Sequence, residues 1–268
     1  MPPGMLSVLR PFERFAFRVM RSLNSGASSW PAWIWQRWVL IPLVGLFVRR
    51  RVRVHGLERL RGLPPGAPLL LVSNHRSFFD QFVLCAELMR VPELRRHLSF
   101  PVRANFFYES PLGLLMCMVL SGGTMFPPFF RSAEKMSFNK AALALLIEKL
   151  KRQGQLVGFH PEGKRNQGDD PYTLLPAQPG VGELALKARP VVVPAFIHGL
   201  SNDAGAELRA NLKRERPVIA VFGAPVDLSD FPAETRLTHH KRCADRLNER
   251  IAALGAEERT LRAELPSA

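Results

Sequence analysis

Residues 68–80 read PLLLVSNHRSFFD, an apolar run that ends in a polar segment carrying His75 and Asp80. The run follows a Pro/Gly-rich turn and predicts a buried strand, so His75 lies where that strand ends. Residues five apart face opposite sides of a strand and are roughly 140° apart on a helix. His75 and Asp80 can therefore meet only if His75 lies in a turn and Asp80 in the first turn of the next helix, where Ser77 could be the cap.

In that arrangement His75 would be a base and Asp80 its orienting partner. An aspartate that accepts a hydrogen bond from one imidazole nitrogen fixes the tautomer and leaves the other nitrogen free to take a proton. The structural alternative is a capping aspartate beside a histidine that is satisfied within the fold. This segment alone supports both interpretations equally.

A second polar block, GFHPEGKRN at residues 158–166, follows the apolar residues Leu156 and Val157. It places Glu162, Gly163, Lys164 and Arg165 at another corner between a strand and a loop. Together with the first block, these residues resemble the glycerolipid acyltransferase family. That family carries a His, four residues and an Asp in its first block and a Pro-Glu-Gly-Thr-Arg type sequence in its third.

The resemblance extends from about residue 68 to residue 199. The family's fourth block, a Val-Pro step after a strand, is matched weakly by VVVPAF at residues 191–196. Its second block leads to an arginine that meets the glycerol phosphate, and Arg131 occupies this place, although Pro127 and Pro128 lengthen the run before it. A basic residue near Arg103 faces the acyl donor in the family, and the alternative for Arg103 is a solvated surface arginine.

The third block departs from the family because Lys164 stands where threonine is usual. Lys164 and Arg165 would form an adjacent cationic pair that binds a phosphate, with Glu162 fixing Arg165 as an ion-pair partner or orienting a hydroxyl group. The alternative for the block is a surface turn. A P-loop is a rival interpretation, but Arg165 replaces its Ser or Thr, and Pro161 removes a backbone N–H.

The 268 residues are 47% apolar, which is enough for a sizeable core, and no low-complexity linker divides them. We expect an α/β fold with a mixed, largely parallel central sheet flanked by helices, preceded by a membrane-associating helical segment. Residues 1–50 would form amphipathic and interfacial helices, and residues 51–268 the acyltransferase domain. The apolar segment 111–120 is expected to be a buried helix, or alternatively part of an acyl-chain channel. The other expected elements are strands at 52–54, 68–72, 98–102, 191–197 and 218–222, and helices at 78–89, 132–152, 181–187 and 237–265.

The N-terminal segment indicates a location. Residues 11–23 predict a basic amphipathic helix that binds an anionic membrane or packs on the domain. Residues 30–48 begin with tryptophans and are followed by arginines at positions 49, 50, 51 and 53, but Pro42 should interrupt the segment. We expect an interfacial or re-entrant segment on the cytoplasmic face of a membrane, or alternatively a span in which Arg37 snorkels. No secretory signal is expected.

The charge predicts anionic partners, since 37 Lys and Arg against 23 Asp and Glu give +14. Composition admits nucleic acid, phosphorylated small molecules and acidic lipid headgroups; the resemblance favours lipid and not nucleic acid. Three widely spaced cysteines indicate core thiols, and no metal-ligand spacing occurs.

The resemblance implies transfer of a fatty acyl group from acyl-CoA or acyl-carrier protein to a lysophospholipid, with 1-acylglycerol-3-phosphate as the expected acceptor and no cofactor or metal. No Gly-x-Ser-x-Gly sequence is present, so an acyl-enzyme is not expected and His75 would act on the acceptor's own hydroxyl. The alternatives are an enzyme for another lysolipid and a non-catalytic, basic membrane-binding protein.

Overall fold

The computed structural model describes residues 6–25 and 29–265 and is built around β2 (Leu69–Ser73). Every residue of β2 is buried. Leu69 and Leu71 contribute to one core cluster, whereas Leu70 and Val72 contribute to another. Because successive side chains of a strand point to opposite faces, β2 has a core on each side, as expected inside a parallel sheet.

Seven strands form one sheet in the order β1-β7-β6-β2-β5-β3-β4. Only the pairing of β6 with β7 is antiparallel among these described strands. The predicted mixed, largely parallel sheet is therefore confirmed. Besides β2, the strands are β1 (Val52–His55), β3 (His97–Arg103), β4 (Met125–Phe129), β5 (Gln155–Phe159), β6 (Val191–His198) and β7 (Val218–Phe222).

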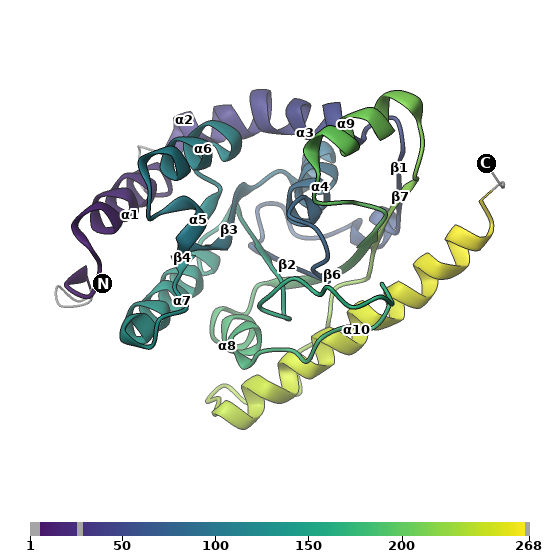
Figure 1. The fold of residues 1–268 in the computed structure, drawn as a ribbon. Helices are drawn as coiled ribbons and strands as arrows, with labels where there is room; N and C mark the ends of the chain where they lie inside the picture. The colour runs from purple at the N-terminus through teal and green to yellow at the C-terminus, as the bar shows by residue number, and fades with distance from the viewer. Residues whose placement is uncertain (1–5, 26–28, 266–268) are drawn as a thin grey trace.

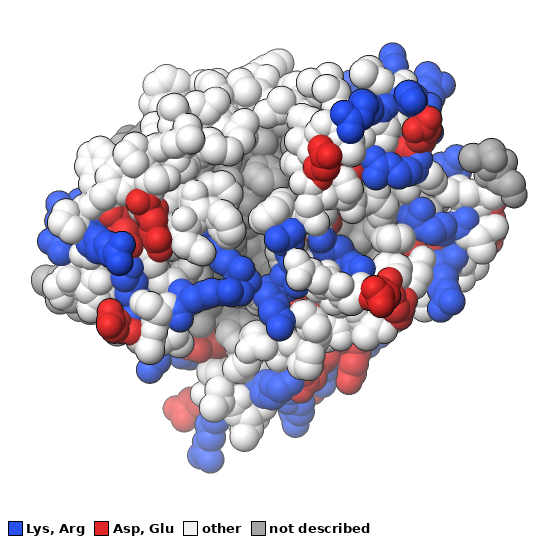
Figure 2. Space-filling view, in the orientation of Figure 1, with Lys and Arg blue, Asp and Glu red and all other residues white. Residues whose placement is uncertain are grey.

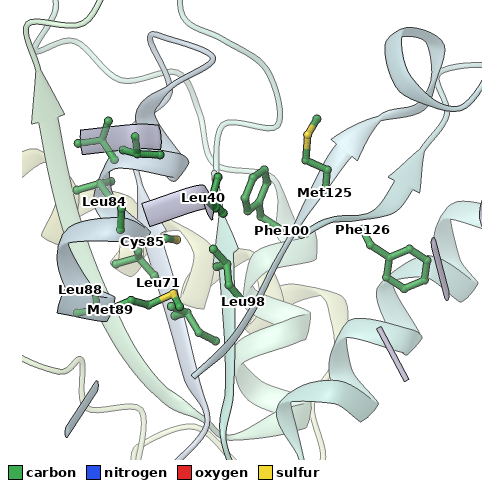
Figure 3. Close-up of a cluster of buried hydrophobic side chains, with 14 of the residues drawn as sticks. Leu40, Leu71, Leu84, Cys85, Leu88, Met89, Leu98, Phe100, Met125 and Phe126 are labelled. Atoms are coloured by element: carbon green, nitrogen blue, oxygen red, sulfur yellow. The ribbon is translucent and has the colours of Figure 1, made fainter. Parts of the chain in front are cut away.

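Helices cover both faces of this sheet (Figure 1). One core lies beneath α3 (Ile41–Val48) and α4 (Asp80–Arg90), and Figure 3 shows Leu84 and Leu88 of α4 beside Leu71 of β2. The other core lies beneath α7 (Met136–Leu150), α8 (Pro179–Ala188) and α10 (Leu237–Ala263). All three cysteines are buried free thiols, as predicted.

The apolar segment Trp30–Val48 is one uninterrupted helix, made of α2 (Trp30–Trp35), η3 (Gln36–Leu40) and α3. The expectation that Pro42 breaks it is wrong. The η3 turn is a π-helix whose wider spacing lets the Ile41 N–H reach the Gln36 carbonyl immediately before the proline. By length and composition alone the 19-residue helix could cross a membrane, although 39% of its most apolar window is buried in the protein.

The first helix, α1 (Pro11–Leu23), packs on the domain. The ring of Phe17 lies 5.5 Å from that of Phe126 and 5.2 Å from that of Phe138. Glu13 of the same helix forms a buried ion pair with Lys135 at 2.7 Å. The core under α4 therefore contains side chains from the N-terminal helices as well as from the segment that follows residue 50. Phe15 and Arg18 of α1 remain exposed.

The helix α6 (Pro111–Ser121) departs from its prediction. The expectation of a buried core helix is wrong because six of its apolar side chains are exposed: Leu112, Leu115, Met116, Met118, Val119 and Leu120. The helices α5 (Ala104–Phe107) and α9 (Ala204–Lys213) were not predicted. Short 3-10 turns complete the fold at η4 (Leu57–Leu60), η5 (Pro92–Leu94) and η6 (Ala133–Lys135).

Candidate active site

His75 and Asp80 meet in the way their spacing predicts, across the turn between β2 and α4. The His75 Nδ1 atom lies 3.4 Å from Asp80 Oδ2. The same carboxylate oxygen accepts the backbone N–H groups of Arg76 at 2.6 Å and Ser77 at 2.7 Å. The predicted cap by Ser77 is wrong, because Phe79 occupies the N-cap position of α4. The Ser77 hydroxyl instead accepts the Phe79 N–H at 3.1 Å and donates to the Ser201 carbonyl. Asp80 itself fixes the turn that carries His75.

Burial controls the protonation of both side chains. Desolvation, followed by the charges of Arg165 and Arg103, lowers the pKa of His75 to about 3. Desolvation raises the pKa of Asp80 to about 6, against the charge of His160 and the N–H groups of the turn. At neutral pH the imidazole is therefore neutral and the carboxylate is ionised. An ionised carboxylate only accepts hydrogen bonds, so it favours the tautomer with the proton on Nδ1 and a free Nε2.

Glu162 joins the two polar blocks through the backbone. Its Oε1 atom accepts the His75 N–H at 2.8 Å, and its Oε2 atom accepts the Leu175 N–H at 2.9 Å. The predicted ion pair between Glu162 and Arg165 is wrong: no such pair forms within residues 29–265. A second link runs from the Asn166 N–H to the His75 carbonyl at 2.7 Å. The third block thus holds the backbone of His75 on both sides.

His160 was not predicted to belong to this site. Its ring lies parallel to that of His75, with centroids 3.8 Å apart and an interplanar angle of 7°. Its Nδ1 atom is 3.1 Å from the Ser73 carbonyl oxygen. Each histidine follows closely on one of two paired strands, since β2 and β5 are neighbours with Val72 opposite Phe159. Only knowledge of the strand order could have revealed this contact.

Three arginines gather at the same end of the sheet. Arg103 ends β3 opposite Phe129, and Arg131 follows two residues beyond Phe129. Burial, followed by repulsion from Arg131 and Arg165, lowers the pKa of Arg103, and Arg103 and Arg165 both act on His75. A register shift in the pairing of β3 with β4 absorbs the additional length of the second block. We call Arg103, Arg131 and Arg165 the arginine cluster. Figure 2 shows Lys and Arg side chains in a band below a hollow in this face.

Lys164 and Arg165, predicted to form an adjacent cationic pair, have different surroundings. The Arg165 guanidinium carbon lies 3.8 Å from the centroid of the Phe78 ring, whereas Lys164 is exposed. Neither side chain forms an ion pair with any residue that the structure describes. Gly163 between this segment and Glu162 has φ +67°, a conformation that favours glycine.

The geometry excludes the P-loop interpretation. Gly158, which would begin the loop, lies inside β5. Between β5 and α8 the fully described segment 160–178 contains no helix, so no helix N-terminus faces the loop.

A model of the acyltransferase family matches residues 51–198, more than half of the 268-residue chain. The chain belongs to the acyltransferase family. The match runs from the start of the sheet to the end of β6 and includes His75, Asp80 and the arginine cluster. The part of the molecule that builds the site is therefore the part this acyltransferase shares with its family.

Two curated relatives match this acyltransferase over different lengths. Human 1-acyl-sn-glycerol-3-phosphate acyltransferase beta is 30% identical over 164 residues, covering 60% of the chain and 53% of the relative. Tafazzin from Drosophila melanogaster is 26% identical over 250 residues, covering 84% and 62%. The chain therefore spans between half and two thirds of the length of these relatives.

The fold of the acyltransferase matches a solved structure. The 1-acyl-sn-glycerophosphate (LPA) acyltransferase PlsC from Thermotoga maritima superposes with a TM-score of 0.56 at 18% identity. The superposition covers 94% of this chain and 89% of PlsC. The two proteins thus share the α/β fold.

Proposed function

We propose that this protein transfers a fatty acyl group from an acyl thioester, either acyl-CoA or acyl-carrier protein, to the hydroxyl group of a lysophospholipid. The observation that carries the proposal is a neutral His75, held 3.4 Å from Asp80 and close to the charges of Arg165 and Arg103. We propose 1-acylglycerol-3-phosphate as the preferred acceptor, in line with the names of the human relative and of PlsC.

In the proposed reaction His75 acts as a general base. Its Nε2 atom takes the proton from the acceptor hydroxyl while that oxygen attacks the thioester carbonyl carbon. The tetrahedral intermediate then collapses and the carbon–sulfur bond breaks. The leaving thiolate takes the proton from the imidazolium. Asp80 stabilises the imidazolium between these two transfers. The products are the diacylated lipid and a free thiol, so protons and electrons balance without a cofactor.

In this proposal the arginine cluster binds the anionic groups of the substrates. Arginine matches two phosphate oxygens with two parallel N–H groups, and we assign the acceptor phosphate to Arg131 and Arg165. Arg103, at the end of β3, is assigned to the thioester oxygen or the phosphates of the donor. Gly163 shapes the turn that presents Arg165, and Lys164 adds a solvated positive charge.

We propose that the protein works on the cytoplasmic face of a membrane as a peripheral or re-entrant protein. The helix 30–48 presents exposed Trp30 and Trp38, side chains that prefer the interface between lipid and water. The basic segment around Arg49 and Arg50 follows this helix directly, which suits anionic lipid headgroups.

The decisive experiment measures thiol release by the full chain with acyl-CoA and with acyl-carrier protein, in vesicles with and without 1-acylglycerol-3-phosphate. We expect acceptor-dependent release and a diacylated product, and a loss of about 10²- to 10⁴-fold in the His75→Ala variant. His55→Ala is the control, because His55 lies in β1 outside the site. Unchanged release in His75→Ala would contradict the role of the base.

A panel of acceptors tests the headgroup. Arg131→Ala is expected to raise KM for a phosphate monoester acceptor more than for a phosphodiester one, because the monoester carries more charge. Faster transfer to another lysolipid would replace the proposed acceptor. Vesicle binding without thiol release from any acceptor would favour the non-catalytic alternative.

A further inference from the structure

The helix α6 has an apolar surface that the acyl-transfer chemistry does not explain. No charged residue occurs between Pro111 and Ser121. Gly113, Leu114, Cys117 and Ser121 form its buried stripe, and the remaining apolar side chains face outward. An uncharged helix with most of its surface exposed is unusual for a side facing water.

The helix α6 and the residue that follows it lie against the apolar helix 30–48. The Trp35 indole N–H donates to the Val119 carbonyl at 3.0 Å, and the indole ring packs so closely on Gly122 that an added Cβ would lie 2.3 Å from it. Two further tryptophans of the helix 30–48, Trp33 and Trp38, are exposed. Figure 1 shows α2 and α6 along one edge, and Figure 2 shows an uncharged surface there.

The same surface reaches the site through two aromatic rings. The helix α5 follows Arg103 directly, packs on α6 and carries the exposed Phe106. The Phe106 ring contacts the exposed Phe78 ring edge-on, with centroids 6.5 Å apart. Phe78 in turn lies beneath the guanidinium of Arg165. We define the lipid strip as the exposed face of α6 together with Phe106 and Phe78.

We propose that the lipid strip inserts into one leaflet of a membrane and is the route along which the acyl chain of a lipid passes to His75. Its occupant is a lipid because the strip is apolar at one end and meets the cationic arginine cluster at the other. An anionic headgroup attached to a long hydrocarbon chain complements both ends at once. The route to His75 rests on the proposed function, whereas the insertion of α6 does not.

Insertion is tested by placing a fluorescent label on α6. Leu112→Cys is labelled with an environment-sensitive maleimide in the full chain, since the natural cysteines are buried. Leu237→Cys is the matched control, because Leu237 is 69% exposed against 67% for Leu112 but lies at the start of α10, away from α6. Vesicles of phosphatidylcholine mixed with phosphatidylglycerol are then added, with and without a quencher attached to the lipid chains.

We expect a blue shift and quenching of the label at position 112, and neither at position 237. A label at position 112 that still reports water while the protein floats with the vesicles would overturn the insertion. Equal quenching at both positions would overturn it too, because it would show contact without a preferred face.

The route is tested by kinetics. The double variant Leu112→Asp with Leu115→Asp is expected to lower kcat/KM by about tenfold or more for a long-chain acceptor held in vesicles, because two carboxylates oppose insertion. Its kcat/KM for a water-soluble, short-chain acceptor should be unchanged, and Leu237→Asp should affect neither substrate. An equal loss for both acceptors, or no loss for the vesicle acceptor, would overturn the route while leaving the proposed function intact. Absence of transfer by the natural sequence would instead refute the function, and the fluorescence result would still decide the insertion.

Discussion

The imidazole of His75 is surrounded by groups that disfavour its protonation. It is mostly buried, Arg165 and Arg103 act on it with positive charge, and the ring of His160 lies against it. A hydrogen bond with the Ser77 backbone is the opposing influence on the pKa of His75, and the Oδ2 atom of Asp80 is already engaged by two backbone N–H groups. A base at this position is therefore available over the whole neutral pH range.

The pH dependence of His75 follows from these neighbours. Because burial, Arg165 and Arg103 lower the pKa of His75 to about 3, the ring should stay neutral at pH 5, where an ordinary histidine is charged. Removing one cation favours the imidazolium, so Arg165→Gln is expected to raise this pKa. Histidine NMR across a pH titration, assigned with His75→Gln, measures it.

The neighbouring Lys164→Gln is the control for that titration, since it removes the same charge from an exposed side chain. It should shift the pKa of His75 less than Arg165→Gln does. A charged His75 at pH 6, or equal shifts in the two variants, would contradict the prediction. Enzyme activity should decline as the pH falls through about 6, where Asp80 takes up a proton and stops accepting from Nδ1.

Substitutions of His160 separate two ways in which it could position His75, by ring stacking or by its hydrogen bond. His160→Phe keeps a ring beside His75 but loses the bond to Ser73, whereas His160→Asn loses the ring and keeps polar atoms. If stacking positions His75, the Phe variant should retain kcat within about threefold and the Asn variant should lose roughly tenfold or more, since small displacements of a catalytic group are costly. The opposite order in single-turnover rates would assign the role to the hydrogen bond.

Among the elements, β3 and the helix 30–48 depend on each other. From His97 to Ser99, β3 pairs with β5 on one side, while its register with β4 begins only at Phe100. The side-chain amide of Gln36 occupies the other side: Nε2 donates to the Leu98 carbonyl at 3.2 Å, and Oε1 accepts the Leu98 N–H at 3.1 Å. One buried glutamine therefore replaces a strand and fixes the apolar helix to the sheet.

Gln36→Leu should destabilise the protein by about 2 kcal/mol or more, because it leaves a buried N–H and a buried carbonyl without partners. Gln36→Glu keeps the acceptor for the Leu98 N–H and loses the donor, so it serves as the paired comparison for the two bonds. Urea unfolding in detergent measures the free energy of unfolding. A change within about 0.5 kcal/mol for Gln36→Leu would show that the amide does not hold the helix.

At the scale of the whole molecule, charge and apolar surface are arranged separately. The chain has a net charge of +14, and charged side chains are spread over much of the visible face (Figure 2). The edge formed by α2 and α6 carries no charge in that view. Two forces of different salt dependence should therefore hold the protein on a membrane: attraction to anionic headgroups, which salt screens, and burial of apolar side chains, which it does not.

Vesicle flotation over a range of salt concentrations separates the two forces. Between about 0.01 M and 1 M salt the Debye length falls from roughly 30 Å to roughly 3 Å, so affinity for anionic vesicles should fall by tenfold or more. Binding to neutral phosphatidylcholine vesicles should change little and should set the floor reached at high salt. Complete release from both kinds of vesicle at high salt would show that apolar insertion contributes nothing.

Much of the fold and the first half of the site follow from local sequence. The strand at β2 and the meeting of His75 with Asp80 depend on a few consecutive residues, because a buried strand and a helix start each have a local pattern. The second half of the site was predicted less well. Glu162 was expected to pair with Arg165 or to orient a hydroxyl group, but its oxygens accept N–H groups from His75 and Leu175, which are 87 and 13 residues away in the chain.

The sequence alone was enough to predict a largely parallel α/β sheet, a His–Asp pair and a basic protein with anionic partners, since each depends on spacing or composition. The stacking of His160 on His75, the placement of Arg165 over Phe78 and the exposure of α6 depended on the folded arrangement. The physical reason is that burial and contact belong to pairs of surfaces. An apolar helix has the same sequence whether it faces a core or a lipid, and only its neighbours in space determine which.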